Sequence, residues 1–355
     1  MKAIDATYIQ KLDQMLQKSA KTVIVTHMKP DGDAAGSTTA MYHFIRQHNG
    51  ADVKIVLNDG FQRALEFLLD ENCRKDICIY SEDPESAAGY IAGADTIICL
   101  DFNAFHRTDR LCSLLEESPA QKVLIDHHLY PELNRFSLAF SETGISSACE
   151  LLYYILMAMP QTGQDARRLP KAAATSLMTG MTTDTNNFAN SVYPSTLAMA
   201  SSLLDAGVDR DYILSCLYNQ HSESRLRLMG HMMKDLLTIT EDGAAYMILD
   251  LETQKKYNVQ EGDTEGFVNM PLSIADVKMS ILIKEDIGKA RVSIRSKKGT
   301  SANMCARTYF NGGGHENAAG GRLNIPGDIE NITQAGAYIE EKTTKFMNEE
   351  NEKHI

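Results

Sequence analysis

Short runs of apolar, β-branched residues alternate with helical segments through the first half of the chain, and this alternation constrains the fold more than any other feature. Five runs are typical of buried strands: residues 23–27, 52–58, 76–81, 96–102 and 122–128. Parallel strands are joined by helical crossovers and covered on both faces, so their sequences are apolar almost throughout. The pattern therefore predicts an α/β fold in which a parallel sheet carries helices on both faces.

Beyond about residue 240 the sequence is typical of a second, smaller α/β domain. Further helices are expected after the first strand series, and a longer helix is expected over residues 222–237. Residues 276–286 and 289–299 then have the pattern of two strands in a hairpin. The predicted parts are a catalytic domain (1–221), a linker helix (222–240), a smaller α/β substrate-binding domain (241–345) and a frayed tail (346–355).

Composition limits the classes of function. The formal net charge is −12 at pH 7, and aromatic residues make up 7% of the chain, with no tryptophan. Proteins that bind long nucleic acids rely on Lys and Arg contacts to phosphates and on aromatic stacking, so long duplex nucleic acid is not an expected partner. No apolar run approaches the roughly 20 residues that span a bilayer. The scattered cysteines form no Cys-x-x-Cys pair, which disfavours a structural zinc site and indicates a reducing, cytoplasmic environment.

The segment THMKPDGDAAGS places His27, Asp31 and Asp33 directly after the first predicted strand and before a helix. In an open α/β sheet, ligands bind beyond the carboxyl ends of the strands. Two carboxylates held this close repel each other unless a cation lies between them. An Asp-rich turn that only caps the following helix explains this segment equally well when it is considered alone.

Three further segments carry the same residue types. Asp101 follows the apolar run TIICL, Asp126, His127 and His128 end LIDHH, and Asp184 lies in the polar segment TTDTNNF. Each segment alone is typical of an ordinary loop. Since the carboxyl ends of parallel strands share one edge of a sheet, these side chains can converge. Carboxylates and imidazoles without thiolates suit Mn²⁺ or Mg²⁺, with Co²⁺ or iron as alternatives.

The motifs, in this order, are recognisable. THMKPDGDAAGS, LDFN, LIDHH and TTDT resemble the four motifs of the DHH phosphoesterase superfamily, and GGGHENAAGG is similar to the glycine-rich signature of its DHHA1 domain. The resemblance extends over about residues 15–340 and is strongest to the bacterial nanoRNase and pAp-phosphatase branch, a short relative of the RecJ exonucleases. It implies a hydrolase with two divalent cations, Mn²⁺ above all, in the first domain.

The resemblance also implies a role for each matched side chain. It implies the following metal ligands: His27 and Asp31 on one ion, Asp33, His127 and Asp184 on the other, and Asp101 between the two. His128 would contact the substrate phosphate or donate a proton to the leaving oxygen, and Asp126 would orient a histidine. Two ions about 3.5–4 Å apart can lower the pKa of a shared water, so the expected nucleophile is the hydroxide that bridges them.

A second set of residues is expected to bind the substrate. Glycines let the backbone of the GGGH segment approach a phosphate, and the resemblance assigns this loop to substrate binding through Gly313, Gly314 and His315. Arg295, on a predicted strand, resembles an arginine of the family that meets the substrate phosphate. Arg107 follows the fourth strand closely enough to reach the phosphate. A plain glycine turn and a solvated arginine are the alternative interpretations.

Together these features predict hydrolysis of short phosphorylated nucleotides: oligoribonucleotides of a few residues, 3′,5′-adenosine bisphosphate (pAp), or linear and cyclic diadenylate. A processive RecJ exonuclease would need additional nucleic-acid-binding domains, and a cleft between two domains would favour short substrates. Exopolyphosphatase or pyrophosphatase activity is the alternative with the same metal chemistry. A nucleotide-sensing protein without turnover is the alternative of another class, which the complete set of ligand candidates disfavours. A homodimer is expected from the family.

Overall fold

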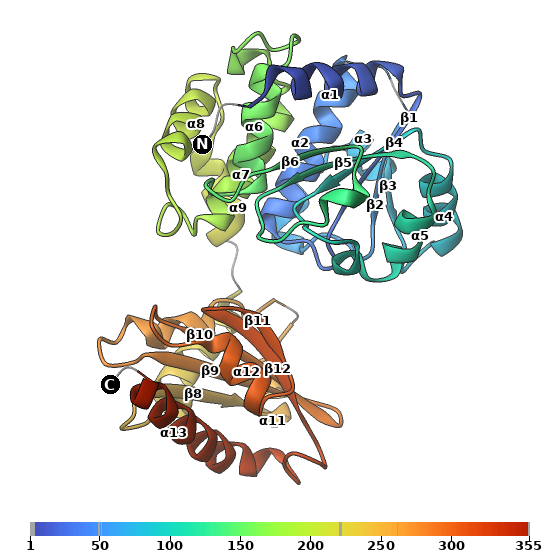
Figure 1. The fold of residues 1–355 in the computed structure, drawn as a ribbon. Coiled ribbons are helices and arrows are strands. Elements are labelled where there is room, and N and C mark those ends of the chain that lie inside the picture. Colours follow the sequence, from blue (N-terminus) through green and yellow to red (C-terminus); the bar gives the residue numbers. More distant parts are fainter. Residues whose placement is uncertain (1–3, 49, 51, 220–221, 261, 354–355) are drawn as a thin grey trace. The chain divides into compact units, whose positions relative to one another are not determined.

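The chain forms two compact units, one up to residue 220 and the other from residue 221 (Figure 1). The computed structural model describes residues 4–353 apart from 49, 51, 220, 221 and 261, and leaves out the side chains of His315 and of residues 350–353. Each unit contains its own sheet and its own core. Among the described residues, no helix has the length and apolar character needed to cross a membrane.

A six-stranded parallel sheet forms the centre of the first unit, in the order β3-β2-β1-β4-β5-β6. Its strands are β1 (Lys21–Thr26), β2 (Asp52–Leu57), β3 (Ile77–Ile79), β4 (Thr96–Leu100), β5 (Gln121–Asp126) and β6 (Leu138–Ser141). The predicted parallel sheet is therefore confirmed. Strand β6 was not expected from the sequence, because its four residues, LAFS, form too short an apolar run to be distinguished from a loop.

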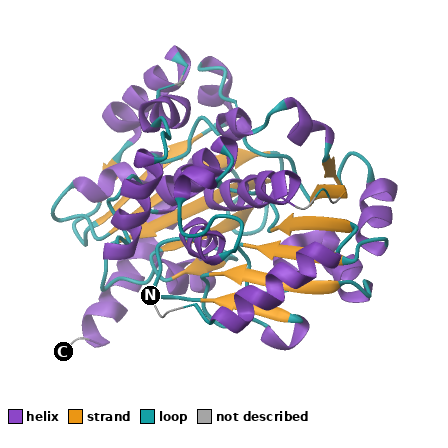
Figure 2. Cartoon of the chain, turned by 90° about the horizontal axis from the view of Figure 1, so that it is seen from above, coloured by secondary structure: helices purple, strands orange, loops and turns teal. Residues whose placement is uncertain are grey.

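Helices cover both faces of this sheet, as expected. Alternate side chains of β1 point to opposite faces: Ile24 packs in the core under α2, α6 and α7, whereas Val23 and Val25 pack in the core under α4 and α5. Helices are purple and strands orange in Figure 2. The α-helices of this unit are α1 (Ala6–Lys18), α2 (Gly32–His48), α3 (Glu71–Lys75), α4 (Pro84–Ala92), α5 (Cys112–Glu117), α6 (Ala148–Ala158), α7 (Lys171–Asp184), α8 (Pro194–Asp205) and α9 (Arg210–Tyr218). Short 3₁₀ turns are Arg63–Leu68, Phe105–Leu111, Leu133–Arg135 and Ala166–Arg168.

Helix α2 is the central helix of this unit and is buried on all sides from Gly32 to Ile45. It lies against α7 at glycines on both helices. A Cβ added at Gly36 would lie 2.6 Å from the carbonyl oxygen of Ser176, and one added at Gly180 would overlap Cys149 and lie 3.0 Å from Asp33 Oδ1. Only glycine permits this approach, which brings the start of α2 and the end of α7 together.

The second unit contains a mixed sheet in the order β11-β12-β10-β9-β8-β7. Among the described strands of this sheet, β8 and β9 pair in parallel and the other neighbours are antiparallel. The hairpin predicted from the sequence is confirmed as β9 and β10. The strands are β7 (Thr238–Ile239), β8 (Ala244–Leu249), β9 (Met279–Asp286), β10 (Lys289–Ser296), β11 (Gly313–His315) and β12 (Ala318–Asn324).

The helices of the second unit include the segment that the sequence predicts as a linker. They are α10 (Glu223–His231), which continues as a π-helical turn (Met232–Leu236), α11 (Leu251–Lys256), α12 (Ala302–Tyr309) and α13 (Ala335–Lys353), with 3₁₀ turns at Phe267–Ser273 and Ile332–Gln334. Leu228 and Met232 pack with Phe267, so α10 belongs to the core of this unit. Phe346 and Met347 are buried, so the segment predicted as a frayed tail begins inside α13.

Candidate metal centre

The predicted metal ligands lie at the carboxyl edge of the parallel sheet, at the point where the strand order reverses. His27 directly follows β1, Asp101 directly follows β4, and Asp126 ends β5. Strands β1 and β4 are neighbours, while β2 lies on the other side of β1. The chain thus leaves β1 and β4 toward opposite faces of the sheet, and it is at such a point that open α/β sheets generally bind ligands.

His27 presents one ring nitrogen to two carboxylates. Its Nδ1 lies 2.8 Å from the carbonyl oxygen of Met28. A carbonyl only accepts hydrogen bonds, so Nδ1 carries a proton and a neutral ring has its lone pair on Nε2. Nε2 lies 3.8 Å from Asp31 Oδ1 and 3.5 Å from Asp101 Oδ2. Burial lowers the pKa of His27, but the Asp101 and Asp31 carboxylates outweigh burial and raise this pKa to about 10.

Asp31 caps α2 and faces His27 at the same time. Its Oδ1 accepts hydrogen bonds of 3.1 Å from the backbone N–H groups of Asp33 and Ala34. The capping interpretation of this turn is therefore correct for Asp31, and it does not exclude a metal site. Burial raises the pKa of Asp31, but the interaction with His27 and the capped N–H groups outweigh burial and lower this pKa to about 2.

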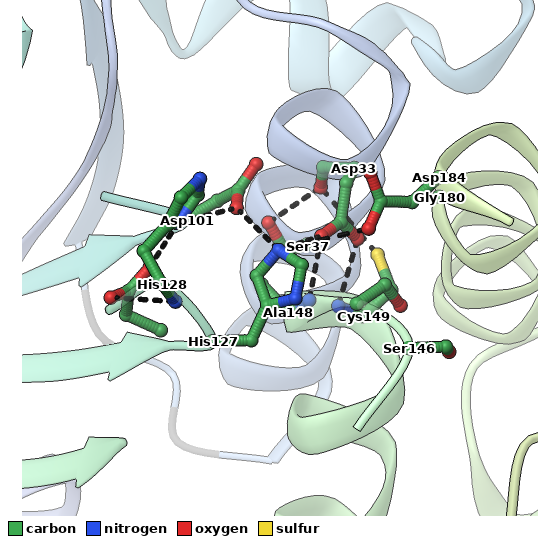
Figure 3. A network of polar contacts seen from close by, with 12 residues as sticks. Asp33, Ser37, Asp101, His127, His128, Ser146, Ala148, Cys149, Gly180 and Asp184 are labelled. Carbon is green, nitrogen blue, oxygen red and sulfur yellow. Dashed lines mark hydrogen bonds and ion pairs between the residues drawn. The ribbon is translucent and has the colours of Figure 1, made fainter. Parts of the chain in front are cut away.

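Asp33 lies in the first turn of α2, and its carboxylate meets the beginning of α6 (Figure 3). Oδ2 accepts a 2.6 Å hydrogen bond from Ala148 N, and Oδ1 accepts a 2.9 Å hydrogen bond from Cys149 N. The N-terminus of a helix favours a negative charge. Burial and the Asp31 charge nevertheless raise the pKa of Asp33 to about 6. The contact between Asp33 and α6 could not be expected from the sequence, because nothing in the local sequence around Asp33 indicates this partner.

Asp101 connects two groups of side chains. Its Oδ2 faces His27, and its Oδ1 lies 3.6 Å from His127 Nε2 and 3.8 Å from His128 Nδ1. The residue has a φ of +61°, in the left-handed region. Its Oδ1 is buried and has no hydrogen-bond partner among the described residues. Burial and the Asp33 charge raise the pKa of Asp101 well above its ordinary value. A buried carboxylate oxygen without a partner is costly, and a bound cation would relieve that cost.

His127 lies among three carboxylates. Its Nε2 is 3.8 Å from Asp33 Oδ2, 3.6 Å from Asp101 Oδ1 and 3.7 Å from Asp184 Oδ2. Burial lowers the pKa of His127, which favours the neutral ring that a metal ligand requires. Asp184 is the last residue of α7 and not part of a loop beyond the helix. Burial and the Asp33 charge raise the pKa of Asp184 to about 7.

His128 is oriented by Asp126. The Asp126 Oδ1 lies 2.7 Å from His128 Nδ1, and Oδ2 accepts a 3.2 Å hydrogen bond from the His128 backbone N–H. Asp126 is completely buried, so the position of its carboxylate is fixed by the end of β5. The His127 and His128 rings are 4.8 Å apart with an interplanar angle of 67°. Both histidines face Asp101 Oδ1, but His128 is held by Asp126, whereas His127 faces Asp33 and Asp184.

The donor set fits two divalent cations. Three groups have potential ligand atoms within 4.8 Å of one another: His27, Asp31 and Asp101; Asp33, His127 and Asp184; and Asp101, His127 and His128. Asp101 belongs to two of these groups. Crowded carboxylates with raised pKa values indicate a site that needs positive charge. Oxygen donors with imidazole nitrogens suit Mn²⁺ and Mg²⁺.

The glycine-rich segment of the second unit is a β-hairpin and not the loop that the sequence predicts. Gly313 and Gly314 lie in β11, which pairs with β12, and Gly314 N donates a 3.1 Å hydrogen bond to Asn303 Oδ1. A Cβ on Gly314 would lie 2.6 Å from the carbonyl oxygen of Ala318, whereas one on Gly313 would meet nothing closer than 3.5 Å. Close strand packing therefore explains why residue 314 is a glycine, but it does not explain the glycine at position 313.

The three remaining predicted substrate-binding residues have different surroundings. Arg295 lies on β10, where its Nη1 donates to the carbonyl oxygens of Ile294 at 2.9 Å and Ala319 at 3.4 Å. Burial lowers its pKa. The His315 backbone pairs in β11, while its side chain is outside the described part of the structure. The Arg107 carbonyl accepts a 2.8 Å hydrogen bond from Met28 N, so Arg107 lies beside the loop that follows His27.

Comparison with known proteins gives consistent matches. Residues 21–181 match the DHH family N-terminal domain, and residues 241–341 match the DHHA1 domain. The crystal structure of an exopolyphosphatase-related protein from Bacteroides fragilis superposes with a TM-score of 0.90 at 36% identity, over 99% of both chains. A probable bifunctional oligoribonuclease and PAP phosphatase NrnA from Streptococcus mutans is 26% identical over 324 residues, 89% of this chain and 94% of that protein. Thermus thermophilus RecJ in complex with Mn²⁺ shares the fold, with a TM-score of 0.56 at 14% identity over 96% of this chain and 55% of RecJ.

Proposed function

The chain belongs to the DHH family and carries a DHHA1 domain behind its DHH domain, and on this basis we propose that it hydrolyses short phosphorylated nucleotides. Family membership makes it a metal-dependent phosphoesterase. The proposed substrates are oligoribonucleotides of a few residues, pAp and diadenylates. The name of the Streptococcus mutans relative, an oligoribonuclease and PAP phosphatase, supports this class of substrate.

The position of Asp101 is the observation that carries the proposal. One of its oxygens faces His27, and the other faces His127. The proposed ligands of one ion are His27, Asp31 and Asp101, and those of the other are Asp33, His127, Asp184 and Asp101. Two divalent cations, Mn²⁺ in the first place, would supply an acidified water and neutralise the charge of the phosphoryl oxygens.

The protein's own groups would hold the substrate and move the proton. His128 is the proposed phosphate contact or proton donor to the leaving oxygen, because Asp126 holds its Nδ1 and fixes the orientation of the ring. The proposed contacts to the rest of the substrate are Arg295, Gly313, Gly314, His315 and Arg107. Of the glycines, Gly313 has the most support as a phosphate contact. Packing does not require a glycine at this position, and a backbone without a side chain can approach a phosphate closely.

A second candidate function is hydrolysis of polyphosphate or pyrophosphate by the same metal centre. The 36% identity to an exopolyphosphatase-related protein favours this alternative. A sensor without turnover is less well supported, because the side chains of all six proposed ligands lie in groups whose ligand atoms are within 4.8 Å of one another.

Turnover by purified protein with Mn²⁺ tests the proposal. Parallel assays use pAp, pApA, a five-nucleotide RNA, pyrophosphate and polyphosphate, with EDTA as a control. Asp101→Asn keeps the shape of the side chain but removes its charge, and Asp205→Asn changes an exposed carboxylate at the end of α8. We expect release of mononucleotides by the wild type and Asp205→Asn, and none by Asp101→Asn or with EDTA. Hydrolysis of polyphosphate or pyrophosphate alone would refute the substrate class, and ion binding without any turnover would favour a sensor.

A further inference from the structure

An exposed tyrosine follows the histidines of the metal centre. Tyr130 is two residues beyond His128, and 88% of its surface is exposed. Two residues of extended chain span at most about 7 Å, so the backbone of Tyr130 lies close to that of His128. A group bonded to a phosphate at His128 is therefore within reach of the Tyr130 ring.

The backbone holds Tyr130 in a conformation that a bulky residue seldom adopts. Its φ is +58°, in the left-handed region. Two hydrogen bonds hold the surrounding turn: Asn103 Nδ2 donates to the Leu129 carbonyl oxygen at 2.7 Å, and Glu132 N donates to the Asn103 carbonyl oxygen at 2.8 Å. Asn103 is two residues beyond Asp101, so the loop that carries the bridging carboxylate also fixes this turn. Strained backbone of this kind clusters at functional sites.

Other apolar side chains are exposed on the loops at the same edge of the sheet. Leu129 is 62% exposed, Leu133 is 52% exposed, and Met28, directly after His27, is 47% exposed. Each of these apolar side chains lies within five residues of His27 or His128, and we call them, together with Tyr130, the apolar rim of the charged centre. A nucleotide matches both surfaces, because its phosphate suits the centre and its base suits the rim. Inorganic polyphosphate matches only the centre.

We propose that the ring of Tyr130 stacks on the base of the substrate and makes the metal centre selective for nucleotides over inorganic polyphosphate. The inference rests on the proposed function, since the phosphate of the same molecule must lie at the metal centre. Every base has an aromatic face, so stacking on one tyrosine accepts different bases. Tyr130 is a binding residue in this proposal and takes no part in proton transfer.

Kinetics with two variants of Tyr130 test the proposal. Tyr130→Phe keeps the ring, and Tyr130→Gly removes it while suiting the left-handed backbone, so the glycine variant should fold normally. The substrates are pApA and a dinucleotide analogue that lacks the base next to the cleaved phosphate. For pApA we expect KM to rise about tenfold or more in Tyr130→Gly and to stay near the wild-type value in Tyr130→Phe. For the abasic analogue KM should be the same in all three proteins.

Tyr8→Ala is the matched control, because Tyr8 is 46% exposed on α1, and it should leave every KM unchanged. Unchanged KM for pApA in Tyr130→Gly, or an equal rise for the abasic analogue, would overturn the inference while the proposed function stands. If the wild type hydrolyses no nucleotide, the proposed function fails, and calorimetric binding of AMP with Mn²⁺ decides the inference separately. Weaker AMP binding by Tyr130→Gly than by the wild type supports it, whereas equal binding, or no binding by the wild type, overturns it.

Discussion

The carboxylate of Asp33, in the first turn of α2, accepts a 2.9 Å hydrogen bond from the backbone N–H of Cys149 at the beginning of α6. The neighbouring Ala148 N–H donates to the other oxygen of the same carboxylate. Asp33 therefore holds two helices together in addition to its proposed role as a metal ligand. Asp184, the last residue of α7, is proposed to bind the same ion, but it accepts no hydrogen bond among the described residues. Removal of Asp33 should therefore lower the free energy of unfolding more than removal of Asp184.

We predict that Asp33→Ala and Asp184→Ala both reduce turnover to the background rate, but that only Asp33→Ala destabilises the metal-free protein. Loss of Asp33 leaves two buried N–H groups without an acceptor, which costs about 2 kcal/mol or more. Burial disfavours the charge of both carboxylates, but Asp184 accepts no hydrogen bond among the described residues, so its loss leaves no N–H group without an acceptor. Denaturant unfolding in EDTA measures the difference. Equal destabilisation by the two variants would contradict this account of Asp33.

We predict opposite effects for two glycine-to-alanine variants. A Cβ at Gly36 would lie 2.6 Å from the Ser176 carbonyl oxygen, so Gly36→Ala should push α2 away from α7 and cost about 1–3 kcal/mol. The same shift would move Asp33 relative to Asp184, so turnover should fall as well. Gly230, in α10, has open space around it, and alanine there should stabilise the helix by about 0.5–1 kcal/mol. Thermal unfolding and turnover of both variants check the prediction, and a neutral Gly36→Ala would refute it.

The motifs and their places at strand ends could be predicted from the sequence, because buried parallel strands are continuous apolar runs and their carboxyl ends share one edge. The strand order could not be predicted from the sequence, because it depends on which strands pair across long loops. The adjacency of β1 and β4 brings Asp101 to His27. The contact of Asp33 with α6 has the same origin, since it joins residues 116 positions apart.

The glycine-rich segment was misinterpreted for a related reason. Glycine has a low intrinsic preference for strands, so GGGHENAAGG indicates a loop when it is considered alone. In the structure, β11 forms because β12 pairs with it and with β10, and the narrow space beside Ala318 and Ala319 favours Gly314. Tertiary pairing therefore determines this element, and local propensity does not.

We predict that Asp126→Asn lowers kcat about 10–100-fold with little change in Mn²⁺ affinity. The carboxylate of Asp126 lies 2.7 Å from His128 Nδ1, and an amide keeps the shape but weakens the hydrogen bond that orients the ring. His127→Asn removes a proposed ligand and is the contrasting variant, which should weaken Mn²⁺ binding as well. Turnover at several Mn²⁺ concentrations distinguishes the two. An Asp126→Asn variant rescued by excess Mn²⁺ would assign Asp126 to metal binding.

We predict that Mn²⁺ binding to the metal-free protein at pH 7 releases protons. The pKa of His27 is about 10 and that of Asp184 about 7, so His27 is protonated and Asp184 half protonated before the ions bind. Metal ligands must give up these protons, so about one proton or more should be released per protein. Calorimetry in two buffers with different ionisation enthalpies measures the number. Binding without proton release would contradict the assignment of His27 as a ligand.

We predict that the metal-free protein is less stable at pH 8 than at pH 5.5, and that Mn²⁺ stabilises it more at the higher pH. The folded-state pKa values of Asp33, about 6, and Asp184, about 7, lie above the ordinary value of 3.8. Between these values the folded state binds more protons than the unfolded state, so stability falls as pH rises through about 4 to 7. His27 acts in the same direction between 6.5 and about 10. Bound cations take the place of these protons as the positive charge at the metal centre, so the loss of stability with rising pH should be smaller when Mn²⁺ is bound. Thermal unfolding with EDTA and with Mn²⁺ at both pH values measures the direction of the change in stability. A metal-free protein that is more stable at pH 8 than at pH 5.5 would contradict the repulsion between these carboxylates.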